Sequence, residues 1–506
     1  MARSERWSGL AIAAFVVGVA AMAVVASIPG SPLHPVLPAG AGPGGPFRWL
    51  ARAARIDRLH GDALVAASIV AIVLAVGTFL WVLLEAWRGN VSLRAVVVLA
   101  VAAHLAVLTL PLLVSRDVYS YIAYGAIAAI HHANPYVQTP VDFPHDAVAA
   151  LVGPKWFATP AVYGPLFTAY AAAVVRLVHG LVAQIQVFRV TATVASLATV
   201  AVVATSARRA WPARAAFAVA AFGLNPVVLF QSVASGHNDL LVALAVASAF
   251  AFVLADHELP AVVALTLGTL VKATAALPLL LLIVWCVARA PAGRRARALL
   301  SRGGLAVAIG AAFAAPFLQL HDPTLGMLEL AGHEGWLAPS RLFRRLLDAV
   351  SGDTLGVAAR IAFAAALVAA VALLIRAVWR AGTEDRSSAL ELGGAWLWSL
   401  LVLMLLGPVL LPWYVTWALP LAWLAPRVPR LVLVGSSAAL AVSQWTAEPA
   451  RFPGAYDANV WIGHYVITPV VIALAGWLLW DGWRRIRDGL PLADQPDEVP
   501  ARAGHG

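Results

Sequence analysis

The residues best suited to chemistry follow the third long apolar stretch, where the letters SRDVYSYIAY run from residue 115 to 124. If a short helix covers residues 117–130, then Asp117, Tyr121 and Tyr124 recur at i, i+4 and i+7 and share one face. The opposite face is apolar, which suits a helix lying flat at a membrane surface. The pattern predicts a carboxylate general base, Asp117, with Arg116 and the two tyrosines lining a sugar site. The alternative is that Asp117 only stabilises the positive end of the helix dipole.

Two further polar features interrupt apolar runs. His237, Asn238 and Asp239 stand in a row between long apolar stretches, where polar side chains are costly unless they bind or cap something. We predict that they contact the substrate; the alternative is a helix cap beside a hydrogen-bonded histidine. Lys272, one of only two lysines against thirty-three arginines, lies inside an apolar run, and phosphate is its natural partner. The alternative is a lysine that extends from a helix end to the membrane interface.

Three weaker segments complete the candidate site. A proline-containing turn occupies 159–165, a loop at 332–336 precedes arginines suited to close over a phosphate, and an aromatic run occupies 411–417. Each also has an ordinary explanation: a connector, a solvated helix face and the aromatic belt of a membrane interface. The predicted phosphate ligands here are Arg341 and Arg345, and the predicted sugar or acceptor ligands are Tyr163, His333, Trp413 and Tyr414.

Metal and nucleotide sites are not visible in the sequence. The thirteen histidines are scattered, and His131 and His132 lack carboxylate or cysteine partners at zinc-ligand spacing. Neither a glycine-rich phosphate loop nor aspartates spaced for a magnesium-bound nucleotide occur. We therefore expect no metal, nucleotide or other cofactor.

The elements that position these residues are apolar helices. Of the 506 residues, 61% are hydrophobic and only 12% are charged, which is far from a soluble composition. A single cysteine excludes an internal disulfide framework, and the net charge of +10 comes from arginines between apolar runs, which argues against nucleic-acid binding.

Since a bilayer-spanning helix needs about 20 apolar residues, we predict an all-α polytopic membrane protein with about 13–15 transmembrane helices. The predicted spans are 10–28, 63–85, 91–113, 162–182, 187–204, 215–233, 239–254, 261–287 (broken near Pro278), 305–320, 355–375, 389–411, 414–424, 431–445 and 460–479.

Arginine in short loops marks the cytoplasmic side of a membrane protein. The clusters predict cytoplasmic N- and C-termini and a site on the extracytoplasmic face of the plasma membrane, with outer loops at 29–61, 115–160, 321–353 and 446–459. Residues 1–480 are then one membrane domain, and 481–506 a polar cytoplasmic tail that we predict to be disordered. The arginines at 208–214 do not fit: either one of the two helices after Pro160 fails to cross, or this cluster breaks the rule.

Taken in order, these segments resemble the polyprenol-phosphate-mannose-dependent mannosyltransferases of actinobacteria. The likeness is greatest to the α-1,6-mannosyltransferases that build lipomannan and lipoarabinomannan cores, within the C-type (GT-C) membrane glycosyltransferase fold, whose extracytoplasmic loops carry short interfacial helices. The segments that carry the resemblance are 115–121, 134–136, 163–165, 224–226, 236–239, 271–275 and 412–414.

The resemblance implies a lipid-linked donor, polyprenyl-phosphate mannose, used outside the cytoplasm without a nucleotide, and a glycolipid or lipoglycan acceptor reached from the surrounding membrane lipids. It also implies that Asp117 is the general base, while the role of Asp239 is carried over less securely. Phosphate is already a good leaving group, so one carboxylate suffices to deprotonate the acceptor hydroxyl. Direct displacement then inverts the anomeric centre, and Lys272, with Arg341 or Arg345, holds the phosphate.

Two other hypotheses stay open at this stage. One is that the same fold uses another polyprenyl-phosphate sugar or another linkage, because nothing in one sequence fixes the hydroxyl pattern that a pocket accepts. A secondary transporter is the rival from a different class, and it would concentrate ionisable groups near the bilayer midplane between broken helices. Here Asp117, His237 and Asp239 are expected at the outer mouth, which favours interfacial chemistry.

Overall fold

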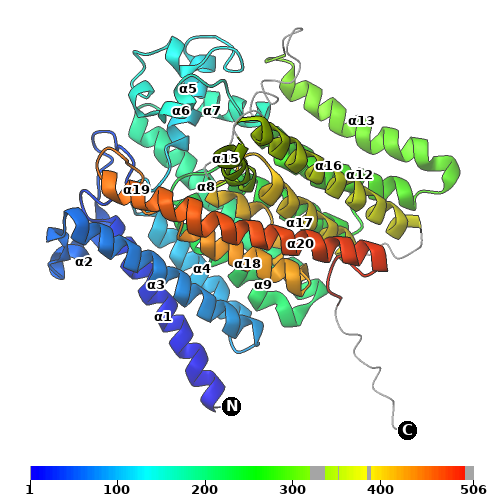
Figure 1. The fold of residues 1–506 in the computed structure, drawn as a ribbon, viewed down its shortest axis with the longest axis horizontal. Helices are drawn as coiled ribbons and strands as arrows, with labels where there is room; N and C mark the ends of the chain where they lie inside the picture. The colour runs from blue at the N-terminus through cyan, green and yellow to red at the C-terminus, as the bar shows by residue number, and fades with distance from the viewer. Residues whose placement is uncertain (1, 319–334, 336, 352, 384–388, 496–506) are drawn as a thin grey trace.

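The computed structural model describes residues 2–318, 335, 337–351, 353–383 and 389–495, which form a bundle of helices (Figure 1). No strand occurs in these ranges. The longer helices are α1 (Ala2–Ala26), α3 (Gly61–Trp87), α4 (Leu93–Leu108), α8 (Leu181–Ala210), α10 (Asp239–Leu254), α11 (Glu258–Val271), α12 (Ala276–Arg289), α13 (Arg295–Ala314), α16 (Asp353–Thr383), α17 (Ala389–Leu406), α18 (Arg427–Ala441) and α20 (Thr468–Asp488).

Shorter helical segments join these helices and cap the bundle. The α-helical ones are α2 (Gly45–Ala53), α5 (Asp117–Ala129), α6 (Pro154–Phe157), α7 (Pro165–Leu177), α9 (Ala215–Gly223), α15 (Pro339–Ser351) and α19 (Pro453–Ile462), and two π-helices are η5 (Val227–Val233) and η10 (Gly463–Ile467). The 3-10 turns are η1 (Ile56–Arg58), η2 (Pro140–Asp142), η3 (Ala149–Leu151), η4 (Pro212–Arg214), η6 (Ala273–Ala275), η7 (Ala292–Arg294), η8 (Pro412–Trp417) and η9 (Leu419–Leu424).

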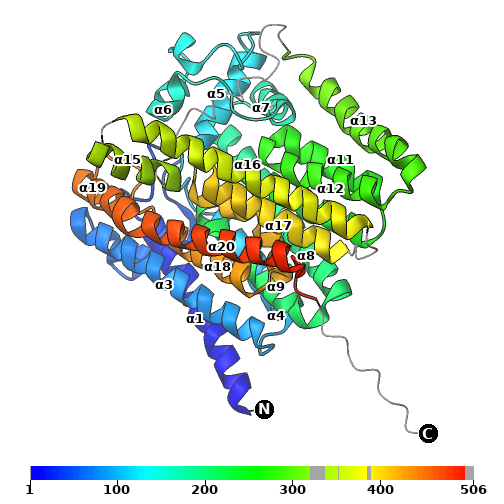
Figure 2. The same ribbon diagram turned by 45° about the vertical axis from the view of Figure 1, so that its right-hand side comes forward.

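The helices are arranged with a pair at one edge and a single helix at the other. α1 and α3 lie side by side, and α13 stands at the opposite edge of the bundle (Figures 1 and 2). In both views α5, α6 and α7 gather at one end of the bundle. This end carries the candidate site described below.

The apolar helices confirm an all-α polytopic membrane protein. Among the described residues, eight helical segments are long and apolar enough to cross a membrane, and five shorter apolar helices of 10–17 residues accompany them. The shorter ones fall in the predicted spans 91–113, 162–182, 239–254 and 261–287. Several of the predicted crossings, such as 91–113 and 162–182, therefore contain helices shorter than predicted.

The break predicted near Pro278 lies elsewhere. The chain leaves α11 at Lys272, whose backbone is extended (φ −154°, ψ 130°), and resumes as α12 after one 3-10 turn. Pro278 stands in the first turn of α12, where the missing N–H of proline would have no helical partner anyway. The prediction was wrong because proline is compatible with a helix start, and the break places Lys272 between two helix ends.

The helix predicted from Asp117 exists, but it does not lie flat on a surface. α5 ends at Ala129, and every residue from 118 to 127 is buried. Its main packing partner is α7, against which Gly125 makes a close backbone approach. The prediction of an amphipathic surface helix was therefore wrong: both faces of α5 are covered, because neighbouring helices and the following loop enclose it.

The position of the arginines at 208–214 agrees with the rule that arginine in short loops marks the cytoplasmic side. α7 is only 13 residues long, whereas α8 has 30 and carries Arg208 and Arg209 in its last turn, with Arg214 in the 3-10 turn that follows. The Arg214 guanidinium stacks on Trp87, on which Arg430 also stacks, and both arginines pair with Asp494. The cluster thus lies at the same end of the bundle as Arg88, which agrees with the first of the two alternatives, a helix after Pro160 that does not cross.

The boundary drawn at residue 481 also needs correction. α20 continues to Asp488, and Asp481 is fully buried and paired with Arg484 and Arg485. Beyond the helix, the Leu492 N–H donates to Glu391 at 2.6 Å. The predicted disordered tail is thus helical or packed as far as 495, and the rest of it, 496–506, lies outside the described residues.

We predict that Gly125→Ala destabilises the protein. A Cβ at this position would lie 2.6 Å from the Ala171 carbonyl oxygen, so α5 and α7 would have to move apart. Overpacking of this kind typically costs about 1–3 kcal/mol, and the melting temperature in detergent should fall. Gly77→Ala in α3, where nothing lies within 4 Å, is the matched control. Equal melting temperatures for the Gly125 variant and wild type would contradict the tight α5–α7 contact.

Candidate active site

Asp117 is the first residue of α5 and is fixed by the loop before it. Val114 has a left-handed backbone (φ 48°), and its carbonyl oxygen accepts a hydrogen bond from Gln444 Nε2 at 2.7 Å. The guanidinium of Arg116 forms an ion pair with Glu448, which is buried. Segments more than 300 residues apart thus hold the catalytic candidate in place, and Arg116 serves as an anchor for the loop.

A fully buried histidine stands beside Asp117. His237 Nδ1 lies 3.5 Å from Asp117 Oδ2, 4.0 Å from Asp239 Oδ2 and 3.4 Å from the Tyr121 hydroxyl. The imidazole stacks on Trp413, with ring centroids 3.9 Å apart and an interplanar angle of 22°. This stacking fixes the ring plane, so His237 keeps one nitrogen facing the two carboxylates.

The second carboxylate, that of Asp239, is paired with Lys272. Lys272 Nζ lies 2.7 Å from Asp239 Oδ1, which also accepts a hydrogen bond from Trp417 Nε1 at 2.6 Å. The ammonium lies over the Tyr414 ring at 4.4 Å from its centroid, and Tyr414 in turn stacks on Trp417. Lys272 is thus enclosed by a carboxylate and two aromatic rings, with 13% of its side chain exposed.

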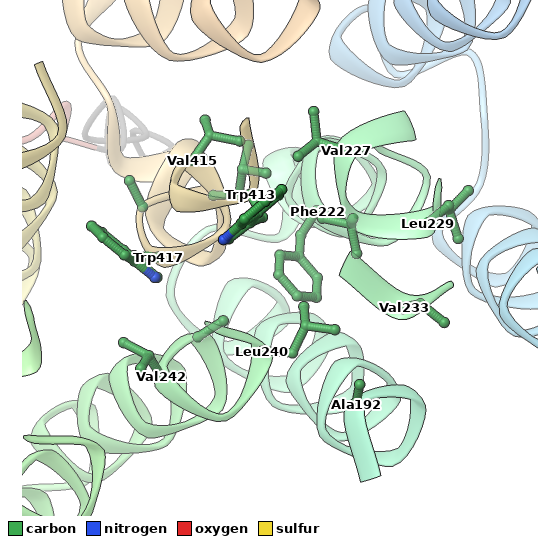
Figure 3. Packing of buried hydrophobic residues seen from close by; sticks show 14 of the residues in the cluster. Ala192, Phe222, Val227, Leu229, Val233, Leu240, Val242, Trp413, Val415 and Trp417 are labelled. Atoms are coloured by element: carbon green, nitrogen blue, oxygen red, sulfur yellow. The ribbon is translucent and has the colours of Figure 1, made fainter. Parts of the chain in front are cut away.

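An apolar layer supports this charge cluster. Figure 3 shows Trp413 and Trp417, from η8, among side chains of the helices that surround them, including Phe222, Leu240 and Val242. Tryptophan rings bury large areas and have few rotamers, so they fix the backbone that carries them. The 3-10 turns of η8 therefore sit rigidly against the start of α10.

The electrostatics favour a proton acceptor at Asp117. Burial raises the pKa of Asp117 to about 6, against the opposing effect of the Lys272 charge, which lowers it. Burial and the Lys272 charge lower the pKa of His237 well below its usual value, so the imidazole is neutral. A carboxylate with a pKa near neutrality, 16% exposed, is well matched to general-base catalysis.

Asp117 lies in the wall shared by two cavities, one of which has many more polar and charged side chains in its lining than the other. The polar cavity, about 760 Å³, is lined by Asp117, Lys155, Trp156, Gly335, Arg341, Arg344, Arg345, Val409, Leu411, Trp413, Gln444, Thr446, Ala447, Pro449, Tyr456, Asn459, Val460 and His464. The apolar cavity, about 240 Å³, is lined by Asp117, Trp156, Val162, Tyr163, Lys272, Ala273, Thr274, Leu403, Gly407, Pro408, Val409, Leu411, Trp413, Tyr414 and Trp417.

The predicted site residues fall into three groups around these cavities. Asp117 and Trp413 line both; Tyr163, Lys272 and Tyr414 line the apolar cavity, and Arg341 and Arg345 the polar one, so the predicted phosphate ligands do not converge on one point. The predicted site residues that line neither cavity are Arg116, Tyr121, Tyr124, His237, Asn238 and Asp239. His333 lies outside the described residues.

Several residues of the polar cavity were missed by sequence reasoning. Lys155 is the other lysine of the chain, so each lysine lines one of the two cavities that share Asp117. The rarity of lysine was the signal that could have found it. Gln444, Asn459 and His464 come from the C-terminal third and have no motif around them.

Among the described residues, no group of three or more His, Cys, Asp or Glu side chains is placed to hold a metal ion.

The candidate site is thus a partly buried acid at the ends of apolar helices, between two cavities of a polytopic membrane protein. The chain belongs to the alpha-(1->6)-mannopyranosyltransferase family: the family model for the N-terminal domain matches residues 7–289, and the model for the MptB C-terminal domain matches 347–475. The protein is therefore a mannosyltransferase, as its sequence resemblance predicted.

A characterised relative extends this match over most of the chain. The sequence is 27% identical over 441 residues, 82% of this chain and 81% of the relative, to alpha-(1->6)-mannopyranosyltransferase A of Mycobacterium tuberculosis. No solved structure matches. The glycosyltransferase assignment is thus supported along both halves of the molecule.

We predict an acid limb near pH 6 in the pH profile of kcat/KM. Asp117 accepts a proton only when ionised, so activity should fall as the pH drops below its raised pKa of about 6. In Lys272→Met the loss of the positive charge should move the limb to higher pH, whereas Lys272→Arg, which keeps the charge, should not. A limb near 3.8, the ordinary value of an aspartate, would contradict the perturbed base.

Proposed function

We propose that the protein transfers mannose from polyprenyl-phosphate mannose to a glycolipid or lipoglycan acceptor, with inversion, to form an α-1,6 linkage of a lipomannan or lipoarabinomannan type of mannan. The observation that carries this proposal is the position of Asp117 in the wall between the apolar and the polar cavity. A lipid-linked donor and a hydrophilic acceptor need adjoining sites of these two kinds. The family membership supports mannose as the transferred sugar.

The donor fits the apolar cavity. Its aromatic and aliphatic lining suits the first isoprenoid units and one face of the sugar, and Tyr163, Trp413 and Tyr414 contribute rings to that lining. Lys272 supplies the positive charge that stabilises the phosphate as it leaves. Since this charge belongs to the chain, the reaction needs no nucleotide or metal cofactor.

The acceptor hydroxyl then enters from the polar cavity. Asp117 takes its proton while the acceptor oxygen attacks the anomeric carbon, and the C–O bond to phosphate breaks on the opposite side. The products are the mannoside and polyprenyl phosphate, with the proton on Asp117. A β-linked donor gives an α-linked product because a single displacement inverts the centre. His237, neutral and fixed by Trp413, orients the carboxylate.

We place the site on the extracytoplasmic face of the plasma membrane, with both termini in the cytoplasm. The support is the arginine rule. Arg88, Arg214, Arg430 and Asp494 meet around Trp87 at one end of the bundle, and none of them touches the cavities beside Asp117. The polyprenyl chain and the acceptor lipid would then both be supplied by the outer leaflet.

Two alternatives make different predictions. Another polyprenyl-phosphate sugar or linkage would use the same base and cavities, and only a panel of donors and acceptors distinguishes it. A secondary transporter would bind its substrate between broken helices near mid-membrane. The cluster here lies where α5, α10 and α12 begin and where α17 has ended, which favours chemistry at a membrane interface.

We predict that Asp117→Asn abolishes transfer. The variant keeps the shape of the side chain but cannot accept a proton, so kcat should fall about 10²–10⁴-fold. The measurement is mannose transfer from polyprenyl-phosphate mannose to a mannosyl glycolipid in detergent, with binding of the donor followed separately. Asp62→Asn, an exposed aspartate in the first turn of α3, is the matched control.

The outcomes of this assay separate the hypotheses. Transfer by wild type, lost in the Asp117 variant with donor binding retained, supports the reaction and the base together. Transfer that survives in the variant moves the base to another residue. No transfer by wild type with any member of a panel of lipid-linked sugars would contradict the proposed function.

A further inference from the structure

The lining of the polar cavity is rich in cationic side chains. Within the described ranges it contains Lys155, Arg341, Arg344 and Arg345, and one acidic side chain, Asp117. Arg344 is paired with Asp348, 3.0 Å away. Lys155 and Arg345 form no ion pair within the part of the chain that the structure describes.

The cations are also close enough to one another to interact unfavourably. Partial burial lowers the pKa of Lys155, and the charge of Arg341 lowers it further. Lys155 is on α6 and leans over the ring of the adjacent Trp156 at 5.2 Å from the centroid, while the arginines are on α15. Two elements far apart in sequence thus bring like charges to one cavity, which an anion would stabilise.

The rest of the cavity wall has the character of a carbohydrate site. Amide, hydroxyl and aromatic groups line it, from Gln444, Thr446, Tyr456 and Asn459. Lys272, in contrast, lies in the apolar cavity and already faces Asp239. The positive charges of the site are therefore divided between two places, one beside the apolar surface and one beside the polar groups.

We propose that Lys155 and Arg345, with Arg341 beside them, form a phosphate-binding subsite for the acceptor. The acceptor is then an anionic glycolipid whose phosphodiester lies near the sugars that the polar cavity holds, whereas the phosphate of the donor is held at Lys272. This inference rests on the proposed function, and it assigns Arg341 and Arg345 to the acceptor instead of the donor. It also gives Lys155 a role in acceptor specificity.

The test compares two acceptors that differ only in charge. An α-1,6-linked dimannoside is prepared with an octyl phosphodiester aglycone and with a neutral octyl aglycone, and the KM of the full-length enzyme is measured for each and for polyprenyl-phosphate mannose. Wild type should have a KM about tenfold lower for the charged acceptor, as expected for charge-assisted hydrogen bonds. Inorganic phosphate should inhibit competitively against this acceptor.

Substitutions then locate the subsite. In Lys155→Met and Arg345→Met the ratio of the two acceptor KM values should fall toward one, and Lys155→Arg should restore it. Arg294→Met, at the cavity formed by α12 and α13 away from the site, is the control. An equal KM for both acceptors in wild type, or a rise in the donor KM instead of the acceptor KM, would overturn the inference.

A binding measurement separates this inference from the proposed function. Calorimetry with the two acceptors and no donor does not depend on transfer. Tighter binding of the charged dimannoside, lost in the Lys155 variant, supports the subsite even if no mannose is transferred. Equal binding of both acceptors overturns the subsite even if the enzyme proves active with the proposed donor.

Discussion

The site depends on one ion pair buried at the meeting point of three helices. Lys272 ends α11 and precedes α12, and Asp239 begins α10, so the contact of 2.7 Å ties these three elements together. Removing one partner of such a pair leaves a buried charge and typically costs about 3–5 kcal/mol. The pair also sets the charge around Asp117, because the ammonium lowers the pKa of this carboxyl group, which burial and the Asp239 charge raise.

The position of Asp117 depends on contacts that are remote in the chain. The ion pair of Arg116 with Glu448 and the hydrogen bond from Gln444 hold its loop, while Gly125 lets α5 approach α7 closely. These restraints come from the two family regions of the chain, before and after residue 300. The geometry of the candidate site is thus a property of the whole bundle, since the N-terminal half contributes Asp117 and the C-terminal half contacts the loop before it.

In the proposed reaction, a lipid-linked donor and a hydrophilic acceptor have to meet at one base. The two cavities provide this arrangement, since one is walled by aromatic rings and the other by amides, hydroxyls and cations. Trp413 belongs to both walls and also stacks on His237, so the partition between the cavities and the orientation of the base are set by the same side chain. A rigid aromatic residue suits this double role because its few rotamers leave little freedom.

The sequence by itself determined the apolar helices, because long apolar runs have few alternatives. It also determined the acid at the start of α5, the polar row at 237–239 and the lysine that follows α11, because each is a local departure from an apolar run. It misjudged the exposure of α5, the break near Pro278 and the tail after Asp481, since these depend on what packs against a segment. Only the tertiary structure decided that Lys272 pairs with Asp239, that Arg116 anchors a loop, and that Lys155 joins the arginines of α15. Burial and long-range pairing are properties of the folded chain, and a local pattern carries no information about which distant side chain fills the space beside it.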